Sequence, residues 1–295
     1  MVDGIYRSER RAHIRVKAAH SDAGDRINED VVGYCDEAAW VIDGATGLGP
    51  SLLGVESDAA WLAGLIDRSL RAAFARDPEQ PTRAILRSVI ETCRDAVEHH
   101  KMRPGEDACE LPSAAFAMVR ATPDGAEIST LGDCRVAYQA PDGTARLFGR
   151  TALTAIEART IAEAKRLLAD DPTLDNAGLR AGLADILRDN RRLMNRPGGY
   201  WIMSTTPEAA DHVDQTLIAG SEIHCAIASD GFLRLQDLFG LLDADAMLAV
   251  DTADKLSGRL TELRAIEQQD AACRRFPRVK IRDDASFIRL RCHAG

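Results

Sequence analysis

The sequence lacks the segments that would direct it to a membrane. None of its apolar runs approaches the roughly 18 residues of a membrane-spanning helix. The segment Met1–Arg11 is charged and has no apolar stretch of the roughly 7 to 15 residues that a signal peptide needs. These absences predict a soluble, cytoplasmic protein that does not bind a membrane.

Cysteine and histidine are present, but not in the patterns that form metal sites or nucleophilic centres. The seven cysteines are odd in number and contain no CxxC pair or paired ligand spacing, so we expect reduced, mostly structural thiols. None of the seven histidines lies beside a candidate motif in an arrangement that suggests a catalytic triad.

The chain also lacks an excess of basic residues, internal repeats, low-complexity tracts and a clear linker. Its formal net charge of -9 argues against a protein that binds nucleic acid through the phosphate backbone. With 295 residues and 45% hydrophobic content it can bury a sizeable core. We expect one domain over residues 1–295, with 150–200 as an insertion or flap. The sequence gives no indication of oligomeric state.

Hydrophobic periodicity indicates strands and helices that do not alternate regularly. The predicted strands are 13–18, 31–35, 39–42, 113–120, 126–131, 135–139 and 200–204, and the predicted helices are 57–76, 82–100, 157–170 and 179–195. Strict strand-helix alternation, which is typical of a parallel doubly wound sheet, is therefore missing. The pattern favours an α+β fold in which two antiparallel sheets form a central sandwich flanked by pairs of helices.

Acidic residues stand where apolar strands are expected to begin or end. Asp43-Gly44 follows an apolar strand, Asp230-Gly231 follows another, and Asp283 precedes the last. Carboxylates are the hard oxygen ligands that hold Mg²⁺ or Mn²⁺, and few protein ligands are needed because water completes the coordination shell. Two such ions can activate water and compensate charge on a phosphoryl group, so phosphate-ester hydrolysis fits this chemistry.

A single Asp-Gly pair is a common turn and carries little weight, but this chain holds an ordered set of acidic motifs. In chain order they are Asn28-Glu29-Asp30, Asp43-Gly44, Gly132-Asp133-Cys134-Arg135, Asp230-Gly231 and Asp283-Asp284. Between residues 28 and 288 the chain resembles the metal-dependent, type-2C protein serine/threonine phosphatase family (PPM). The fold of that family, a β-sandwich flanked by helices, agrees with the predicted order of elements.

The resemblance implies a site with two Mn²⁺ or Mg²⁺ ions. Asp43 would bridge both ions, the carbonyl oxygen of Gly44 would contact one, and Asp230 with Asp283 would bind the other. The attacking group would be a water that bridges the ions, so no side-chain nucleophile is implied.

Three further roles are implied around this pair of ions. Glu29 and Asp30 would act mostly through metal-bound water. Asp133 would help to place a third ion or its water shell, and a plain hairpin turn is the alternative for this residue. Arg26 matches the arginine that grips phosphate in the family, although it stands four positions before Asp30 where relatives have five.

Other departures point to a divergent bacterial branch of the family. Ala45-Thr46 follows Gly44, so the histidine proposed as general acid in some members is missing. The basic run Lys280-Ile281-Arg282 would add positive potential near a phosphate or form a solvated charge cluster. The glycines of 44–49 imitate a nucleotide-binding loop, but their spacing does not fit, and no parallel strand-helix-strand unit follows.

These observations predict a signalling hydrolase that removes phosphate from serine or threonine of a phosphorylated protein. Two alternatives stay open. A scaffold or signalling module of the same fold without catalysis would explain the missing histidine and the shifted Arg26. A phosphatase for a small metabolite would use the same metals with a different pocket, because substrate choice lies in loops.

Overall fold

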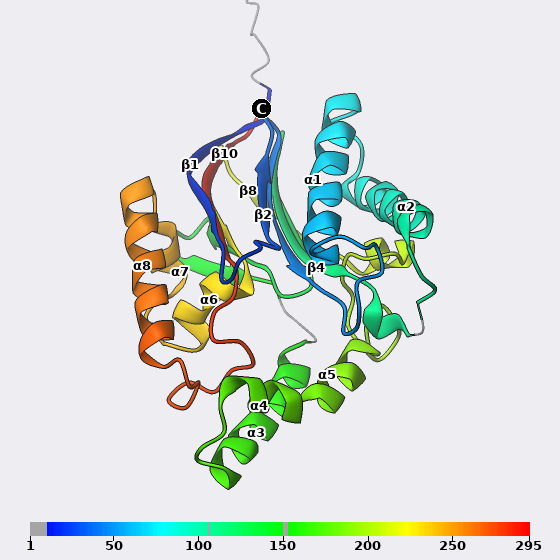
Figure 1. The fold of residues 1–295 in the computed structure, drawn as a ribbon. Helices are drawn as coiled ribbons and strands as arrows, with labels where there is room; N and C mark the ends of the chain where they lie inside the picture. Colours follow the sequence, from blue (N-terminus) through cyan, green and yellow to red (C-terminus); the bar gives the residue numbers. More distant parts are fainter. Residues whose placement is uncertain (1–10, 106, 150–152) are drawn as a thin grey trace, which may run out of the picture.

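The computed structural model describes residues 11–105, 107–149 and 153–295, and two packed β-sheets form its centre (Figure 1). Each sheet has five strands, and all neighbouring strands are antiparallel. The first sheet has the order β1 (His13–Asp22), β10 (Ala285–His293), β9 (Glu222–Ala228), β6 (Arg135–Gln139) and β7 (Ala145–Phe148). The second has the order β2 (Val31–Tyr34), β3 (Ala38–Ala45), β4 (Ser113–Thr122), β5 (Gly125–Leu131) and β8 (Asp214–Ala219).

Helices cover the outer faces of both sheets. The second sheet is covered by α1 (Asp58–Arg76) and α2 (Thr82–His100), and the first by α6 (Asp230–Asp237), α7 (Ala244–Leu248) and α8 (Ala253–Gln269). The short 3-10 helices are η1 (Ala108–Glu110) and η2 (Pro207–His212). This arrangement confirms the predicted α+β sandwich flanked by helices. Among the described helices, none combines the length and apolar character that crossing a membrane requires.

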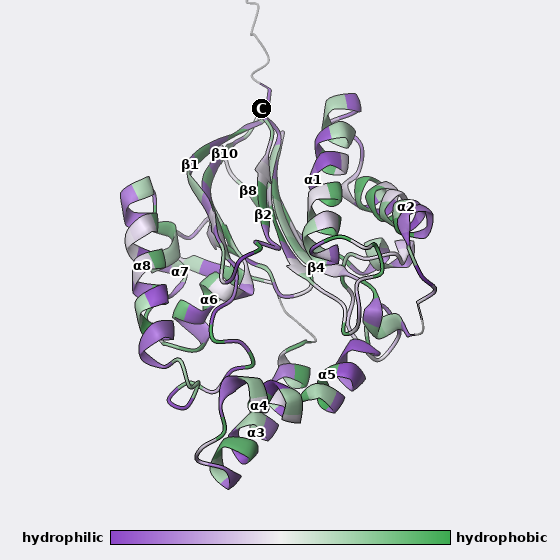
Figure 2. Cartoon of the chain, viewed as in Figure 1, coloured by the Kyte–Doolittle hydropathy of each residue, from purple (hydrophilic) through white to green (hydrophobic). Residues whose placement is uncertain are grey.

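The sequence of β3 shows why the layers pack in this way. Successive side chains on a strand point to opposite faces. Trp40 and Ile42 join the core beneath α1 and α2, whereas Ala39 and Val41 join the core between the sheets. Both faces of β3 are therefore apolar, and Figure 2 shows green stretches along the strands between the helices.

The ends of α1 and α2 agree with the sequence signals. Ser57 caps α1, since its hydroxyl accepts a hydrogen bond from the backbone N–H of Ala60 at 3.1 Å. The helix ends at Arg76, before Asp77-Pro78. The second helix has the predicted bounds, and Pro81 at its N-cap lacks a side-chain cap.

Two local predictions were wrong. The segment 200–204 is not a strand, because it makes only isolated bridges from Tyr200 to Met194 and from Met203 to Ala114. The helix expected over 179–195 is two shorter helices, α4 (Asn176–Gly182) and α5 (Ala184–Arg191), joined at Leu183. The Asn195 side chain accepts a hydrogen bond from the Ile202 N–H at 2.9 Å, which stabilises a loop in place of a strand.

The helices α3 (Leu153–Asp170), α4 and α5 gather at one end of the sandwich, at the bottom of Figure 1. They share a small apolar cluster that includes Ala164, Leu168 and Leu179. We call residues 153–200 the flap. The predicted insertion begins at 150, but 150–152 lie outside the described residues, as do residues 1–10 of the charged N-terminal segment. The single-domain assignment stays a prediction.

Candidate functional site

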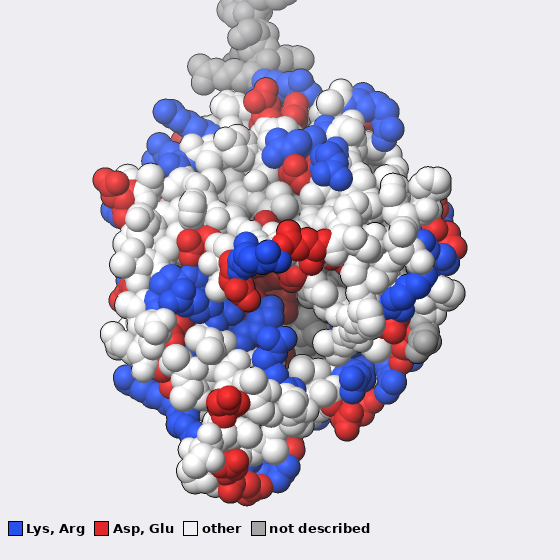
Figure 3. Space-filling view, in the orientation of Figure 1, with Lys and Arg blue, Asp and Glu red and all other residues white. Residues whose placement is uncertain are grey.

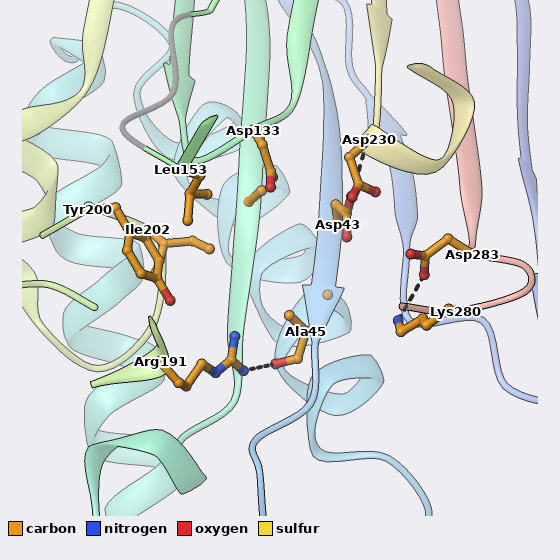
Figure 4. Close-up of a pocket in the computed structure, with 12 residues that line it drawn as sticks. Asp43, Ala45, Asp133, Leu153, Arg191, Tyr200, Ile202, Asp230, Lys280 and Asp283 are labelled. Carbon is orange, nitrogen blue, oxygen red and sulfur yellow. Dashed lines mark hydrogen bonds and ion pairs between the residues drawn. The ribbon is translucent and has the colours of Figure 1, made fainter. Parts of the chain in front are cut away.

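The acidic motifs meet at the ends of strands from both sheets and at the turn that connects one sheet to the other. Asp43 lies near the end of β3 in the second sheet, and Asp133 lies in the turn between β5 and β6, which belong to different sheets. Asp230 follows β9 and Asp283 precedes β10, both strands of the first sheet. All four side chains line one pocket of about 160 Å³ (Figure 4). The pocket is also lined by Gly44, Ala45, Ala115, Leu153, Arg191, Tyr200, Ile202 and Lys280.

Close backbone contacts fix the two glycine turns beside these carboxylates. A Cβ atom on Gly44 would overlap the carbonyl oxygen of Glu29, and one on Gly231 would overlap the carbonyl oxygen of Asp284. Both positions need glycine because another segment of the site lies directly against the backbone. The backbone N–H of Asp230 donates to Asp43 Oδ2 at 3.4 Å, which links the two sheets within the site.

Glu29 and Asp30 precede β2 and take different environments. The Glu29 carboxylate accepts hydrogen bonds from the hydroxyls of Thr46 and Ser57, both at 2.6 Å. Asp30 is 6% exposed, and neither of its carboxylate oxygens has a hydrogen-bond partner. Because buried polar atoms are normally paired, an unpaired buried carboxylate indicates a water or a cation as its partner.

Asp284 holds the Glu29-Asp30 segment in place. Its carboxylate accepts hydrogen bonds from the backbone N–H groups of Gly24 and Glu29, each at 2.7 Å. Asp284 thus contacts two residues that precede it in the sequence by 260 and by 255 positions. Asp284 is therefore a positioning residue of the site, and the sequence motif did not reveal this role.

Burial and mutual repulsion raise the pKa values of most of these carboxyl groups. Burial raises the pKa of Asp43 well above its usual range, and the charges of Asp30 and Asp230 raise it further. The pKa of Asp133 is raised by burial and by Asp230. Burial is also the main reason that the pKa of Asp30 rises to about 8. Crowded carboxylates of this kind favour a bound cation, which offsets the repulsion.

Asp283 differs because two basic side chains contact it. Lys280 Nζ lies 2.8 Å from Oδ1 and Arg234 Nη2 lies 2.9 Å from Oδ2. Although burial acts in the opposite direction, these two cations lower the pKa of Asp283. Arg234 also pairs with Glu267, which is fully buried, at 2.6 Å. Asp283 therefore carries a charge that the protein already compensates in part.

Arg26 does not reach the pocket. Its side chain is 78% exposed and forms an ion pair with Glu56, and Arg26 is not among the pocket-lining residues. Arg26 lies in a bend between β1 and β2, so its spacing from Asp30 in the sequence does not fix the direction of its side chain. Phosphate binding by Arg26 stays a prediction that this geometry does not support.

Two basic residues line the pocket in its place. Lys280 belongs to the basic run noted in the sequence. Arg191, at the end of α5, gave no sequence signal, because α5 carries so many charged residues that any one of them reads as solvent-exposed. Figure 3 shows Lys and Arg side chains gathered beside a hollow on this face of the molecule.

The donor set fits hard divalent cations such as Mg²⁺ or Mn²⁺ by its chemistry. Carboxylate oxygens, the Gly44 carbonyl and the unpaired oxygens of Asp30 are the ligands such ions prefer. Within the described residues, however, no three acidic, histidine or cysteine side chains come together closely enough to hold one ion. The fit therefore depends on mixed coordination in which water completes the shell. The individual ligand roles of Asp43, Gly44, Asp230, Asp283, Glu29, Asp30 and Asp133 stay predictions.

Solved structures share this fold. The catalytic domain of the serine/threonine protein phosphatase PstP, in complex with two manganese ions, aligns with a TM-score of 0.55 and 16% identity over 96% of this chain and 99% of that chain. PppA of Pseudomonas aeruginosa, a regulatory component of its T6SS, aligns with a TM-score of 0.53 and 14% identity over 95% and 98%. The PPM Ser-Thr phosphatase MsPP of Mycobacterium smegmatis, in complex with cacodylate, gives 0.51 and 15% over 95% and 99%.

At these identities the likeness establishes the fold. No curated protein shows significant sequence similarity to the chain. A family model supplies the missing sequence evidence, since the model described as protein phosphatase 2C matches residues 11–177. This range includes Asp30, Asp43 and Asp133, while Asp230 and Asp283 join them through the fold. The chain therefore belongs to the protein phosphatase 2C family.

Proposed function

We propose that the protein is a metal-dependent phosphatase that hydrolyses phosphoserine and phosphothreonine in a protein substrate. The observation that carries this proposal is the convergence of Asp43, Asp133, Asp230 and Asp283 on one pocket, beside the unpaired carboxylate of Asp30. When bound, two Mn²⁺ or Mg²⁺ ions lower the pKa of the attacking water and offset charge on the phosphoryl oxygens.

The residues of the chain then hold and orient the reactants. Water adds to phosphorus, the ester P–O bond breaks, and the serine or threonine oxygen leaves with a proton, which yields the free hydroxyl and inorganic phosphate. No histidine is among the residues that line the pocket, so the leaving oxygen takes its proton from water. The crowded aspartates position the metals, and Arg191 and Lys280 supply positive charge.

The size of the pocket supports a protein substrate over an enclosed metabolite. Its volume of about 160 Å³ is below the roughly 300 to 1,000 Å³ of pockets that enclose a small ligand. A phosphoryl group fits into such a space while the rest of the substrate lies outside. Parallel assays on phosphopeptides and a panel of phosphorylated metabolites test this preference, and selective turnover of metabolites would reject it.

Catalysis itself is tested with p-nitrophenyl phosphate. We expect hydrolysis that requires added Mn²⁺ and that falls at least about 100-fold in Asp43→Asn and Asp230→Asn, because each change removes a carboxylate ligand. Thermal unfolding of both variants controls for loss of the fold. Turnover that persists in a chelator, or in both variants, would contradict the proposal.

A non-catalytic scaffold is the second candidate, and one observation favours it. Asp283 is already paired with Lys280 and Arg234, which reduces its need for a metal. Calorimetric titration with Mn²⁺ separates the two candidates. A phosphatase binds the ion with measurable heat and turns over, whereas a scaffold that has lost its metals does neither.

A further inference from the structure

The pocket needs a binding site for the phosphoryl group of its substrate, and this inference rests on the proposed function. A phosphate monoester is an anion, and four aspartates line the pocket. Arg26, the arginine that the family resemblance assigns to phosphate, is paired with Glu56 at the surface. The basic side chains that line the pocket are Arg191 and Lys280.

Arg191 is held in place and keeps one buried donor atom without a partner. Its Nη2 donates to the carbonyl oxygens of Ala45 at 2.6 Å and Thr46 at 3.1 Å. These bonds fix the guanidinium against the end of β3, two residues after Asp43. Its Nε is buried and has no hydrogen-bond partner. A buried guanidinium nitrogen without a partner is costly unless a ligand or water accepts its hydrogen bond.

Lys280 stands across the pocket from Arg191 (Figure 4). Its ammonium contacts Asp283, and its side chain is 46% exposed. Because the lysine side chain is long and flexible, the ammonium can turn from the carboxylate towards a phosphate oxygen. The preceding residue is anchored to the flap. Val279 packs on the apolar cluster of the flap, and its carbonyl oxygen accepts a hydrogen bond from Asn176 Nδ2 at 3.3 Å.

We propose that Lys280 and Arg191 bind the phosphoryl group from opposite sides of the pocket, in the place of Arg26. The ligand is a phosphate monoester dianion, and the product, inorganic phosphate, is held by the same two side chains. Both residues depend on the flap, because Arg191 belongs to it and Lys280 follows a residue packed against it. The position of the flap thereby sets the spacing of the two cations.

A purely structural role makes different predictions. If Lys280 only compensates Asp283, its removal changes the affinity for Mn²⁺ and leaves phosphate binding unchanged. If Arg191 only fastens the flap to Ala45 and Thr46, its removal lowers stability and affects the KM of large substrates more than phosphate binding. Direct measurement of phosphate binding therefore separates these roles.

The test measures inorganic phosphate in two ways, as a competitive inhibitor of p-nitrophenyl phosphate hydrolysis and as a titrant in calorimetry with and without Mn²⁺. Lys280→Gln and Arg191→Gln should each weaken phosphate binding by about tenfold or more, the effect expected for one charged hydrogen bond. Lys280→Arg should restore much of the loss. Arg282→Gln and Arg192→Gln are the matched controls, because both arginines are neighbours in sequence whose side chains bond outside the pocket. Arg282 bonds to Gln268, and Arg192 bonds to Asp107 and Asp189.

Unchanged phosphate binding in both Lys280→Gln and Arg191→Gln would overturn the proposal, and so would a loss confined to Arg26→Gln. If Arg191→Gln does not fold, Lys280→Gln and Lys280→Arg still decide. The proposed function can fail separately. If the wild-type protein shows no Mn²⁺-dependent turnover, but calorimetry shows that both variants weaken phosphate binding, the phosphate-binding site is supported and the phosphatase activity is rejected.

Discussion

The carboxylate of Asp284 accepts the backbone N–H of Glu29 at 2.7 Å, and this hydrogen bond joins the start of β10 to the segment that carries Asp30. The same carboxylate accepts the N–H of Gly24. One side chain thus fixes the loop that leads from the first sheet into the second. The metal candidates depend on it although it does not line the pocket.

Replacement of Asp284 should therefore weaken metal binding. Asp284→Ala removes both acceptors, and we expect a loss of roughly 10 to 100-fold in Mn²⁺ affinity, the range typical of residues that orient metal ligands. Asp284→Asn keeps one acceptor oxygen and should lose less. Calorimetric titration with Mn²⁺ measures the effect. Equal affinity of Asp284→Ala and wild type would show that the loop does not need this support.

The raised carboxyl pKa values predict how stability depends on pH when metal is removed by a chelator. Asp30 has a pKa near 3.8 in the unfolded chain and about 8 in the folded protein. Between these values the folded protein holds a proton that the unfolded chain has released. The stabilisation is thus present at low pH and is lost as pH rises through about 8, by at most about 1.4 kcal/mol per pH unit for one proton.

Urea unfolding from pH 5 to 9 in a chelator checks this expectation. Wild-type protein should lose stability across the range, and Asp30→Asn should lose less, because the amide does not titrate. Added Mn²⁺ should oppose the loss at high pH, where the carboxylates are ionised. Wild-type stability that increases steadily towards pH 9 in the chelator would contradict the assigned direction of the pKa shift.

The close contact at Gly44 predicts a specific sensitivity to a methyl group. Gly44→Ala would press a Cβ against the Glu29 carbonyl, and we expect a loss of about 1 to 3 kcal/mol in the free energy of unfolding. Gly258→Ala is the control, because its Cβ would enter open space on α8. That change should stabilise by roughly 0.5 to 1 kcal/mol, since alanine favours a helix over glycine. Similar effects at both positions would contradict this account.

The ion pair of Arg234 and Glu267 predicts a large cost when one partner is lost. Glu267 is fully buried and Arg234 is 12% exposed. Arg234→Met leaves Glu267 with Arg264 alone and removes one cation from Asp283, so we expect destabilisation of about 3 to 5 kcal/mol. The double variant Arg234→Met with Glu267→Gln should recover part of the loss in urea unfolding. A double variant no more stable than the single one would argue that the two charges are not coupled.

The sandwich was predictable because apolar residues recur at regular intervals along its strands and covering helices, where each element buries one or both faces. The alternation near His13–Asp22 and the apolar stripe of α2 are of this kind. The strands β7 and β8 were missed, because each is short and part of its side chains remains exposed. The segment 200–204 resembles a strand in sequence for another reason. Tyr200 and Ile202 join the core between the sheets and Met203 joins the core beneath α1 and α2, although the segment does not pair along its length.

The site was predictable as a set of acidic motifs but not as a geometry. The order of Asp43, Asp230 and Asp283 along the chain indicated a shared function, and the fold brings their side chains to one pocket. The direction of Arg26 and the approach of Arg191 depend on loop and flap positions that sequence spacing does not encode. The pairing of Lys280 with Asp283 likewise needs the path of the loop that leads into β10.

The strand order places β10 between β1 and β9, so the last strand of the sequence separates the first from the rest of its sheet. During synthesis on the ribosome, β1 cannot pair until β10, more than 260 residues further along the sequence, has been made. Such long-range pairing is slow, and it completes the segment that carries Asp283 and Asp284. The site is consequently incomplete until β10 has paired, because Asp283 and Asp284 lie directly before that strand.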